Sequence, residues 1–389
     1  MKIAVVSNIY AHGKILQEIG TPIVLAAGDI SEIESIDVFT HLRTAEEIEF
    51  NKKVRVIPII DPDKTSSYFH LYKAIVKSNY DRVLINSMPT SQGSKIMPNL
   101  LYLLMPIILS RFYRINVSVL YHNSPYLNDV KKLGYSGILD SIKSPAIKLI
   151  EGKMFTSCNV YFLLKQYADR IKQINPDGKT DYLRPNGMAG FTTLYLNDKL
   201  RLDSLERTYS EQDFSLLIYG SWGPQKDILK ALEAVRIIKN SSLRIKVTVA
   251  GDVNLHFPSY KEEFERTLSE YSPYIDKRLQ YVNEIDLHSL FLNADVIVLP
   301  YTTPGGFSGV LSVAILFKLH VVVPEFEEYI EQTQGYDKVH FIPINFEVND
   351  IALAIKRILL NDQFQQKERI IKPRQMFEDF VFEIRKMIA

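Results

Sequence analysis

Short apolar runs rich in β-branched residues recur along almost the whole chain, and longer amphipathic segments separate them. Such runs predict buried strands. The predicted strands of the first half are residues 3–6, 54–58, 82–86, 116–121 and 159–163. Those of the second half are residues 214–219, 244–250, 295–300 and 319–324. Because strands that alternate with helices form parallel sheets with helices on both faces, the fold class is α/β.

The amphipathic segments predict helices between these strands. One segment places Ile228, Ala231, Leu232 and Val235 on one face. A second segment repeats apolar residues from 351 to 359, and Asn349 is its expected N-cap.

The alternation breaks at residues 197–213, which are charged and aperiodic, and a strand follows directly. We therefore expect two doubly wound parallel-sheet domains, residues 1–205 and 206–375, joined by this linker. Residues 376–389 are amphipathic and predict a closing helix that packs back on the first domain.

The most apolar stretch runs from Leu100 to Leu109, and Pro98 and Pro106 are expected to interrupt it. It has about half of the roughly twenty residues that a membrane-spanning helix needs. A buried helix is the plainer interpretation. The alternative is a helix at a membrane surface, since cationic side chains flank the stretch. The first residues lack the apolar core of a signal peptide, so we expect a cytoplasmic protein.

Composition narrows the classes of function. The chain has 389 residues, and its 46 Lys and Arg against 45 Asp and Glu leave a net charge of +1. That balance disfavours a bulk polyanion binder, and no nucleic-acid partner is expected. The single cysteine, Cys158, excludes a disulfide framework and a multi-cysteine metal site.

Ligands of open parallel sheets bind beyond the carboxyl ends of the strands, so chemistry is sought there and in the cleft expected between the domains. After the strand at 214–219 come Gly220, Ser221, Gly223 and Lys226, and then a helix. Glycine turns, a helix N-terminus and a lysine together are typical of phosphate recognition. The plainer alternative is an ordinary strand-to-helix turn with a surface lysine.

A second loop follows the strand at 295–300 and leads into an apolar helix. Its candidate residues are Gly306, Phe307, Ser308, Gly309 and Val310. Ser308 is a good N-cap, and the glycines leave backbone amides accessible at the helix start, which predicts a second anion cradle. The alternative is a helix whose cap serves stability alone.

The first domain offers polar residues after two of its strands. His122 and Asn123 follow the strand at 116–121, and Asn8, His12 and Gly13 follow the first strand. A histidine at such a strand end lies where ligands bind, although a lone histidine is more often structural. Asn186 and Gly187 form a turn near the domain boundary.

Several standard motifs are missing from the sequence. There is no Gly-x-x-x-x-Gly-Lys-Ser/Thr loop, and the absence of Gly-x-Gly-x-x-Gly disfavours a nicotinamide enzyme. There is no Gly-x-Ser-x-Gly elbow and no His-Glu-x-x-His or paired-acid metal pattern. No metal site is therefore expected.

Taken in order, these segments resemble the retaining GT-B glycosyltransferases of the large family four. The spacing of Gly220 and Lys226 matches that family, as does Ala250-Gly251-Asp252 at the end of a strand. The remaining matches are Asn293-Ala294-Asp295, Leu299-Pro300, Gly306-Phe307, Ser308 to Leu311, Pro185 to Met188, and His122. The resemblance implies a GT-B fold, that is, two Rossmann-like domains facing a cleft. It also implies a hexosyltransferase that uses a nucleotide-diphosphate sugar as co-substrate, with no cofactor.

Three positions depart from the family pattern. The family's two glutamates fall on Gly305 and Val313, and its arginine falls on Ser221. The glycine-rich first loop is reduced to Gly13. The contact that the second glutamate makes with the donor's ribose must therefore come from elsewhere, and one of two cations at the diphosphate is missing.

The resemblance assigns roles to the candidates. Lys226 and the amides of Ser308, Gly309 and Val310 are expected to stabilise the leaving diphosphate without a metal. His122 is expected to contact the sugar or the diphosphate. The other donor-binding candidates are Gly220, Ser221, Gly223, Gly306, Phe307, Asn186 and Gly187. The acceptor-side candidates are Asn8, His12, Gly13 and Asn123.

The acceptor is expected to be a glycan, a lipid-linked sugar or a polysaccharide. Contact with the inner face of the membrane is one interpretation of the basic residues in the first domain, and a solvated surface is the other. Those basic residues are Lys131, Lys132, Lys143, Lys148 and Lys153. Two alternative functions stay open: a non-catalytic GT-B binding subunit and a sugar-nucleotide epimerase of the same fold.

Overall fold

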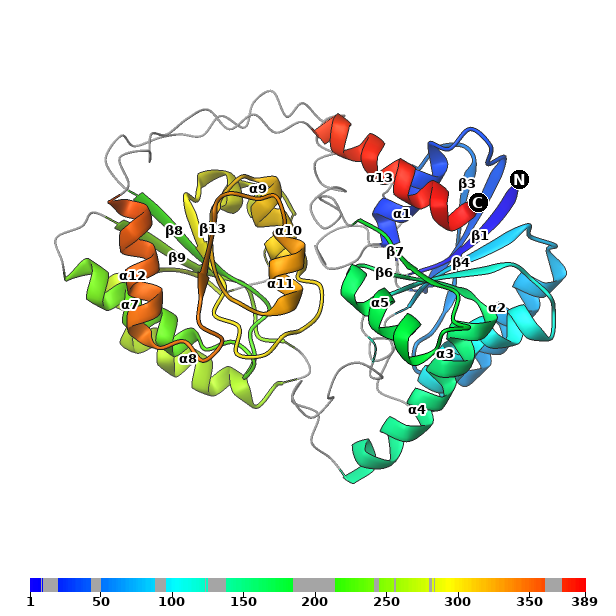
Figure 1. Cartoon of the computed structure of the whole chain (residues 1–389), viewed down its shortest axis with the longest axis horizontal. Coiled ribbons are helices and arrows are strands. Elements are labelled where there is room, and N and C mark those ends of the chain that lie inside the picture. Colours follow the sequence, from blue (N-terminus) through cyan, green and yellow to red (C-terminus); the bar gives the residue numbers. More distant parts are fainter. Residues whose placement is uncertain are drawn as a thin grey trace. The chain divides into compact units, whose positions relative to one another are not determined.

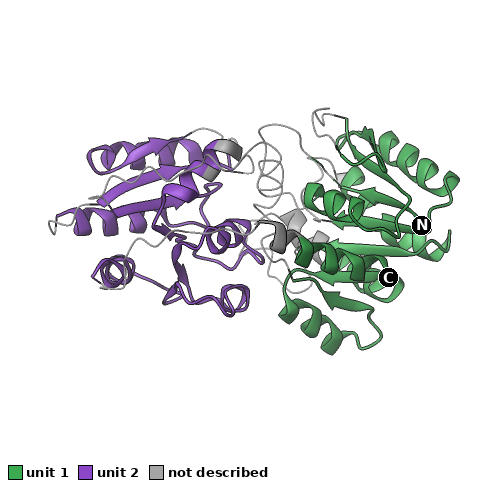
Figure 2. Ribbon diagram, turned by 90° about the horizontal axis from the view of Figure 1, so that it is seen from above, with its two compact units in different colours: residues 1–12, 17–192, 374–389 green, residues 13–16, 193–373 purple. Residues whose placement is uncertain are grey.

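The computed structural model describes most of the chain as two compact units (Figure 2). The described residues are 1–7, 9, 20–42, 50–87, 96–122, 124, 138–184, 214–240, 245–254, 257–279, 282, 284–360 and 373–389. Unit 1 comprises residues 1–12, 17–192 and 374–389, and unit 2 comprises residues 13–16 and 193–373. The linker expected at 197–213 lies outside the described residues.

Unit 1 is built on a parallel sheet with the strand order β3-β2-β1-β4-β5-β6-β7 among its described residues. The strands are β1 (Lys2–Val6), β2 (Ser35–His41), β3 (Val54–Ile60), β4 (Arg82–Ser87), β5 (Val117–Tyr121), β6 (Asn159–Phe162) and β7 (Thr180–Tyr182). The central strands are almost completely buried, as expected for a sheet covered on both faces. The strand order reverses between β1 and β4, which makes their carboxyl ends a topological switch point.

Six helices flank this sheet in the described part of unit 1 (Figure 1). They are α1 (Gly20–Gly28), α2 (Thr65–Lys77), α3 (Ile96–Arg111), α4 (Ile138–Ser157), α5 (Lys165–Ile174) and α13 (Pro373–Ile388). The last of these, α13, returns from the end of the chain. Its Phe380 and Ile384 are fully buried, and its last carbonyls accept hydrogen bonds from Arg82 and Ser118.

Unit 2 has a second parallel sheet with the order β10-β9-β8-β11-β12-β13. Its strands are β8 (Phe214–Tyr219), β9 (Ile245–Ala250), β10 (Asp276–Arg278), β11 (Val296–Val298), β12 (His320–Pro324) and β13 (Val339–Ile342). Its helices are α7 (Ile228–Lys239), α8 (Tyr260–Glu270), α9 (Glu284–Asn293), α10 (Gly309–Leu316), α11 (Glu327–Gln332) and α12 (Val348–Leu359). A single-turn helix, η2 (Ser272–Tyr274), precedes β10. The two sheets confirm the predicted α/β class.

Two local predictions are wrong. Asn349 is not the cap of α12, because Glu347 occupies the N-cap and forms a reciprocal capping box with Asp350. The prolines do not interrupt the apolar stretch either, because α3 continues through both. Pro98 lies in the first turn, where backbone N–H groups have no intrahelical acceptor. Pro106 is buried inside the helix, where packing outweighs its usual cost.

The apolar stretch 100–109 packs within unit 1, since none of its residues is exposed. The plainer interpretation of a buried helix is therefore confirmed for these residues. Among the described residues, no helix has both the length and the hydrophobicity that crossing a membrane requires.

Candidate functional site

The switch point of unit 2 lies between β8 and β11, where two loops meet at the carboxyl ends of the strands. The loop after β8 is held against the loop after β11 by backbone pairing. Lys226 forms an antiparallel bridge with Tyr301, and the amide of Asp227 donates to the carbonyl of Pro300 at 2.8 Å. The two predicted anion cradles are thus parts of one site.

Lys226 is buried in this site, with 9% of its surface exposed. Its Nζ donates to the carbonyl oxygen of Ser221 at 2.6 Å and lies 5.8 Å from the ring centre of Trp222 and 5.3 Å from that of Tyr301. No carboxylate contacts it in the described part of the chain. Burial lowers the pKa of Lys226 from 10.5 to about 7. The plainer prediction of a surface lysine is therefore wrong.

Glycine is needed at three positions around Lys226, because neighbouring atoms lie too close there for a Cβ. A Cβ on Gly220 would lie 2.7 Å from the Nζ of Lys226, so a side chain there would displace the ammonium. Gly251 has a φ of +104°, and a Cβ there would lie 2.0 Å from the carbonyl oxygen of Gly220. A Cβ on Gly223 would lie 2.8 Å from the ring of Phe257. The site is packed around Lys226.

The second loop begins α10 with Ser308 as its N-cap, as predicted, and the Ser308 side chain accepts from the amide of Leu311. The Ser308 hydroxyl also lies 3.1 Å from the hydroxyl of Tyr301. Gln332, at the end of α11, accepts from the amide of Ser308 at 3.0 Å and donates to its carbonyl at 2.7 Å. Sequence reasoning missed Gln332, and no spacing signal indicates it.

This contact changes which amides can serve a ligand. The amide of Ser308 is already occupied by Gln332, so it is not free for an anion. Gly309 and Val310 begin the helix, where N–H groups have no intrahelical acceptor. Gly306, with a φ of +80°, and the half-buried Phe307 shape the turn before them.

The positions of the family's two glutamates hold no carboxylate. Gly305 is exposed on the loop, and Val313 is buried in α10 with 1% of its surface accessible. Among the described residues, no cluster of three or more His, Cys, Asp or Glu side chains could hold a metal ion. The chemistry of this edge is therefore that of a lysine and backbone amides.

The switch point of unit 1 brings together side chains at the carboxyl ends of β1, β4 and β5. The Nε2 of His122 lies 2.5 Å from Oδ1 of Asn86, and Nδ2 of Asn86 donates to the hydroxyl of Ser7 at 2.9 Å. Burial lowers the pKa of His122 to about 4, so the ring is neutral at pH 7. Asn86 was missed because the pattern of its strand marks it only as a strand residue.

A buried carboxylate lies near the end of β5. Glu151 of α4 accepts from the hydroxyl of Tyr121 at 2.5 Å and from that of Ser124 at 3.2 Å. Tyr121 and Ser124 lie on either side of His122 in the sequence. The burial of Glu151 and its contacts fix the end of β5 on α4.

The remaining predicted site residues lie outside the described part of the chain. They are Asn8, His12, Gly13, Asn123, Asn186 and Gly187. Their assignment as donor-binding or acceptor-side residues stays a prediction.

Part of the chain matches a known protein family, and the whole chain resembles several solved structures. Residues 206–375 match the family described as "Glycosyl transferases group 1". No protein with a curated description matches the chain. Among solved structures, sucrose-phosphate synthase from Thermosynechococcus elongatus is 15% identical, with a TM-score of 0.67 over 100% of this chain and 94% of that chain.

Two further solved structures are similar to this chain. Anabaena Alr3699/HepE, in complex with UDP and glucose, is 13% identical, with a TM-score of 0.64 over 100% of this chain and 98% of that chain. A putative UDP-N-acetylglucosamine 2-epimerase from Listeria monocytogenes is 11% identical, with a TM-score of 0.59 over 100% and 94%. These likenesses show the fold: the two units are the Rossmann-like domains of a GT-B protein.

Proposed function

From the match of residues 206–375 to the glycosyl transferases of group 1, we propose that this chain transfers a sugar from a nucleoside-diphosphate donor to an acceptor hydroxyl. The transfer retains the anomeric configuration and needs no metal. The donor's diphosphate binds at Lys226 and the start of α10, and the transferred group is a hexosyl residue.

One observation carries the proposal. Lys226 is buried at the switch point with a carbonyl oxygen and two aromatic rings as its neighbours, and its charge has no carboxylate partner among the described residues. A buried cation costs free energy unless an anion accompanies it. A diphosphate supplies that anion and also accepts from the amides of Gly309 and Val310.

The same groups stabilise the transition state. As the bond between the anomeric carbon and the donor oxygen breaks, negative charge grows on the leaving diphosphate. Lys226 supplies a positive charge there, and the start of α10 supplies aligned backbone dipoles. Each such donor is typically worth about 2.7–4 kcal/mol. The acceptor hydroxyl attacks from the face that the diphosphate leaves and passes its proton to the leaving diphosphate oxygen, so no protein nucleophile is needed.

His122 acts in this proposal as a neutral hydrogen-bonding group toward the sugar or the diphosphate. Its lowered pKa keeps the ring uncharged, and Asn86 fixes the ring through Nε2. A neutral, oriented imidazole suits recognition of hydroxyl groups, whereas a general acid would need a pKa closer to the working pH.

The same site disfavours the alternative function of a sugar-nucleotide epimerase. UDP-N-acetylglucosamine 2-epimerases are among the similar folds, but the described loop from Tyr301 to Gly309 carries no carboxylate for proton abstraction at a sugar. The family match of residues 206–375 also favours transfer.

We place the acceptor, a glycan or lipid-linked sugar, on the side of unit 1, and the protein at the inner face of the membrane. Helix α4 supports this placement. Leu149 is 69% exposed there, and exposed Lys148 and Lys153 lie on either side of it in sequence. Exposed apolar and basic residues on one helix suit the surface of an anionic bilayer.

Thermal unfolding across UDP, GDP, ADP and their hexose conjugates, with a chelator in place of metal, tests the donor site. UDP is the first choice, since the HepE structure was solved with it. A ligand at 100 times its dissociation constant stabilises the folded protein by about 2.7 kcal/mol, which is a readable shift. We expect one nucleotide to give this shift, and Lys226→Met to abolish it.

Lys246→Met is the matched control, because Lys246 is an exposed lysine on β9 of the same unit. It should keep the full shift. An equal shift in Lys226→Met and the control would place the nucleotide elsewhere. The absence of any shift in the unmodified chain would favour a non-catalytic subunit. Mass spectrometry separates transfer from epimerisation, because only transfer makes the acceptor heavier by one hexosyl residue.

A further inference from the structure

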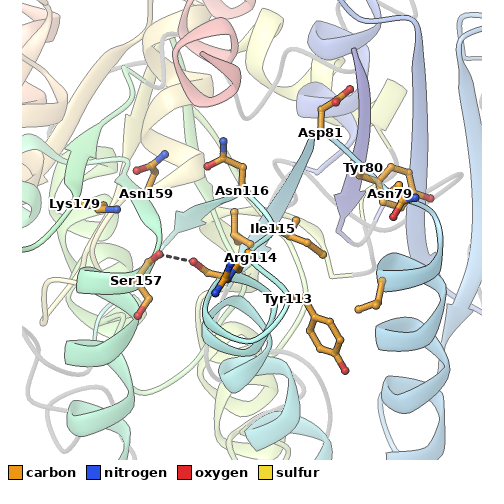
Figure 3. Close-up of a pocket in the computed structure, with 13 residues that line it drawn as sticks. Asn79, Tyr80, Asp81, Tyr113, Arg114, Ile115, Asn116, Ser157, Asn159 and Lys179 are labelled. Atoms are coloured by element: carbon orange, nitrogen blue, oxygen red, sulfur yellow. Dashed lines mark hydrogen bonds between the residues drawn. The ribbon is translucent and has the colours of Figure 1, made fainter.

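An open groove of about 800 Å³ lies at the amino edge of the unit 1 sheet, the edge opposite to His122 (Figure 3). The amino ends of four adjacent strands contribute to it. Asp81 precedes β4, Asn116 precedes β5, Asn159 begins β6 and Lys179 precedes β7. Neighbouring strands lie about 4.8 Å apart, so these four residues form a row roughly 14 Å long.

The other wall is formed by the ends of α2 and α3. Asn79 follows α2 with a φ of +47°, and Arg114 follows α3 with a φ of +54°. Residues other than glycine rarely adopt this left-handed conformation. Tyr113, which is 51% exposed, lies beside Arg114 at the mouth of the groove (Figure 3).

The groove presents polar groups that the protein does not use. In the described part of the chain, the side-chain amides of Asn79, Asn116 and Asn159 have no hydrogen-bond partner. The hydroxyl of Ser157 is buried without a partner, whereas Ser110 donates to the carbonyl of Ser157 at 2.6 Å (Figure 3).

The charges around the groove argue against an anion. Arg114 and Lys179 are opposed by Asp81 and by the carbonyl ends of α2, α3 and α4, which all terminate at this edge. The C-terminal end of a helix carries partial negative charge, so it repels phosphate and carboxylate. A neutral ligand with many hydroxyl groups fits this balance, because amide side chains both donate to and accept from hydroxyls.

We propose that this groove binds a neutral oligosaccharide as a second, non-catalytic glycan site. The ring of Tyr113 provides an apolar platform for the C–H face of a sugar, and the row of Asn159, Asn116 and Asp81 bonds the hydroxyls along its edge. The length of the row and the open shape of the groove suit several linked sugar rings. The site holds a glycan chain on unit 1 while the donor binds in unit 2.

Saturation-transfer NMR on the full chain tests the site, with maltohexaose, cellohexaose, laminarihexaose and N-acetylchitohexaose as probes. We expect transfer to at least one probe. Tyr113→Ala and the double variant Asn116→Ala with Asn159→Ala should each weaken that binding roughly tenfold or more, as titration would show. Phe69→Ala removes another exposed aromatic ring of unit 1, 59% exposed on α2, and should leave binding unchanged.

The proposal fails if no probe shows transfer, or if the groove variants bind as well as Phe69→Ala does. It also fails if pyrophosphate displaces the bound probe, since that would make the groove an anion site. The Lys226→Met protein separates this proposal from the donor site. It should lose the nucleotide and keep the oligosaccharide, so each of the two sites can fail without the other.

Discussion

At the scale of the residue, Lys226 shows how one side chain couples fold and function. Burial lowers its pKa to about 7, so about half of the empty protein carries the charge at that pH. The glycines around it are needed to admit the ammonium, since any side chain at 220 would meet it. Among the described residues no carboxylate neutralises this cation, and we propose that an anionic ligand supplies the missing charge.

Donor binding should therefore depend on pH through Lys226. The bound diphosphate favours the ammonium, so the pKa of Lys226 rises in the complex. Below pH 7 both states hold the proton and affinity is constant. Above pH 7 the empty site loses the proton and binding must take one up, so affinity falls by up to about tenfold per pH unit.

Isothermal titration calorimetry, in which the nucleotide sugar is added to the protein, checks this prediction. In buffers of different ionisation enthalpy at pH 8, the apparent binding enthalpy should report uptake of close to one proton. The nucleotide sugar has no phosphate group that titrates in this range, so the proton belongs to the protein. An affinity that stays flat between pH 7 and pH 9 would show that Lys226 keeps its charge in the empty site.

The sequence predicted Lys226 and Ser308 because both are local signals, a spacing from a glycine and a cap before an apolar run. It did not predict Gln332, Asn86 or Glu151. Each of these acts through a side chain that reaches an element distant in sequence, and no periodicity encodes such a contact. For the same reason the occupied amide of Ser308 was not foreseen.

At the scale of the element, hydrophobic runs predicted most strands because a buried parallel strand is nearly all apolar. The strands β2, β7, β10 and β13 were missed, and in β2 the residues Asp37 and Thr40 break the apolar run. Asp37 is buried nonetheless, because Arg55 donates to it at 2.7 and 2.8 Å and Tyr80 donates at 2.6 Å. The cap of α12 was placed wrongly because Asn349 was judged alone, without the reciprocal bonds of Glu347 and Asp350.

The start of α10 should depend on its contact with α11. Gln332→Leu removes the hydrogen bonds to the amide and carbonyl of Ser308 and to the hydroxyl of Ser312. The Ser308 turn then loses its anchor, and we expect nucleotide affinity to fall roughly tenfold, equal to about 1.4 kcal/mol. Titration calorimetry measures the change.

Gln334→Leu is the control, because Gln334 is exposed two residues further along the chain. It tests whether loss of a nearby glutamine matters in itself. If both variants bind the nucleotide as the unmodified chain does, the α11 contact has no part in holding the donor loop.

At the scale of the whole molecule, both units follow one rule. Each sheet reverses its strand order once, and in each the described candidate residues lie at the carboxyl ends of strands at or next to the reversal. The sequence predicted two such sheets because the alternation of runs and helices appears twice. The helix α13 at the end of the chain belongs to unit 1, where Arg82 and Tyr161 donate hydrogen bonds to its last carbonyls.

The docking of α13 predicts that the two units can be destabilised separately. Arg82, buried at the start of β4, donates to the carbonyls of Met387 and Ala389 and to the hydroxyl of Ser118. Arg82→Met leaves these acceptors without their charged donor, so we expect it to lower the free energy of unfolding of unit 1 by about 2 kcal/mol. For a domain of this size, each kcal/mol lowers the Tm by about 2–4 °C. Trp222, the single tryptophan, is buried in unit 2, so its fluorescence reports that unit alone. Circular dichroism should therefore show an earlier first transition in Arg82→Met, whereas the midpoint of Trp222 fluorescence stays in place. A fluorescence midpoint that moves by the same amount would mean that the two units unfold as one cooperative body.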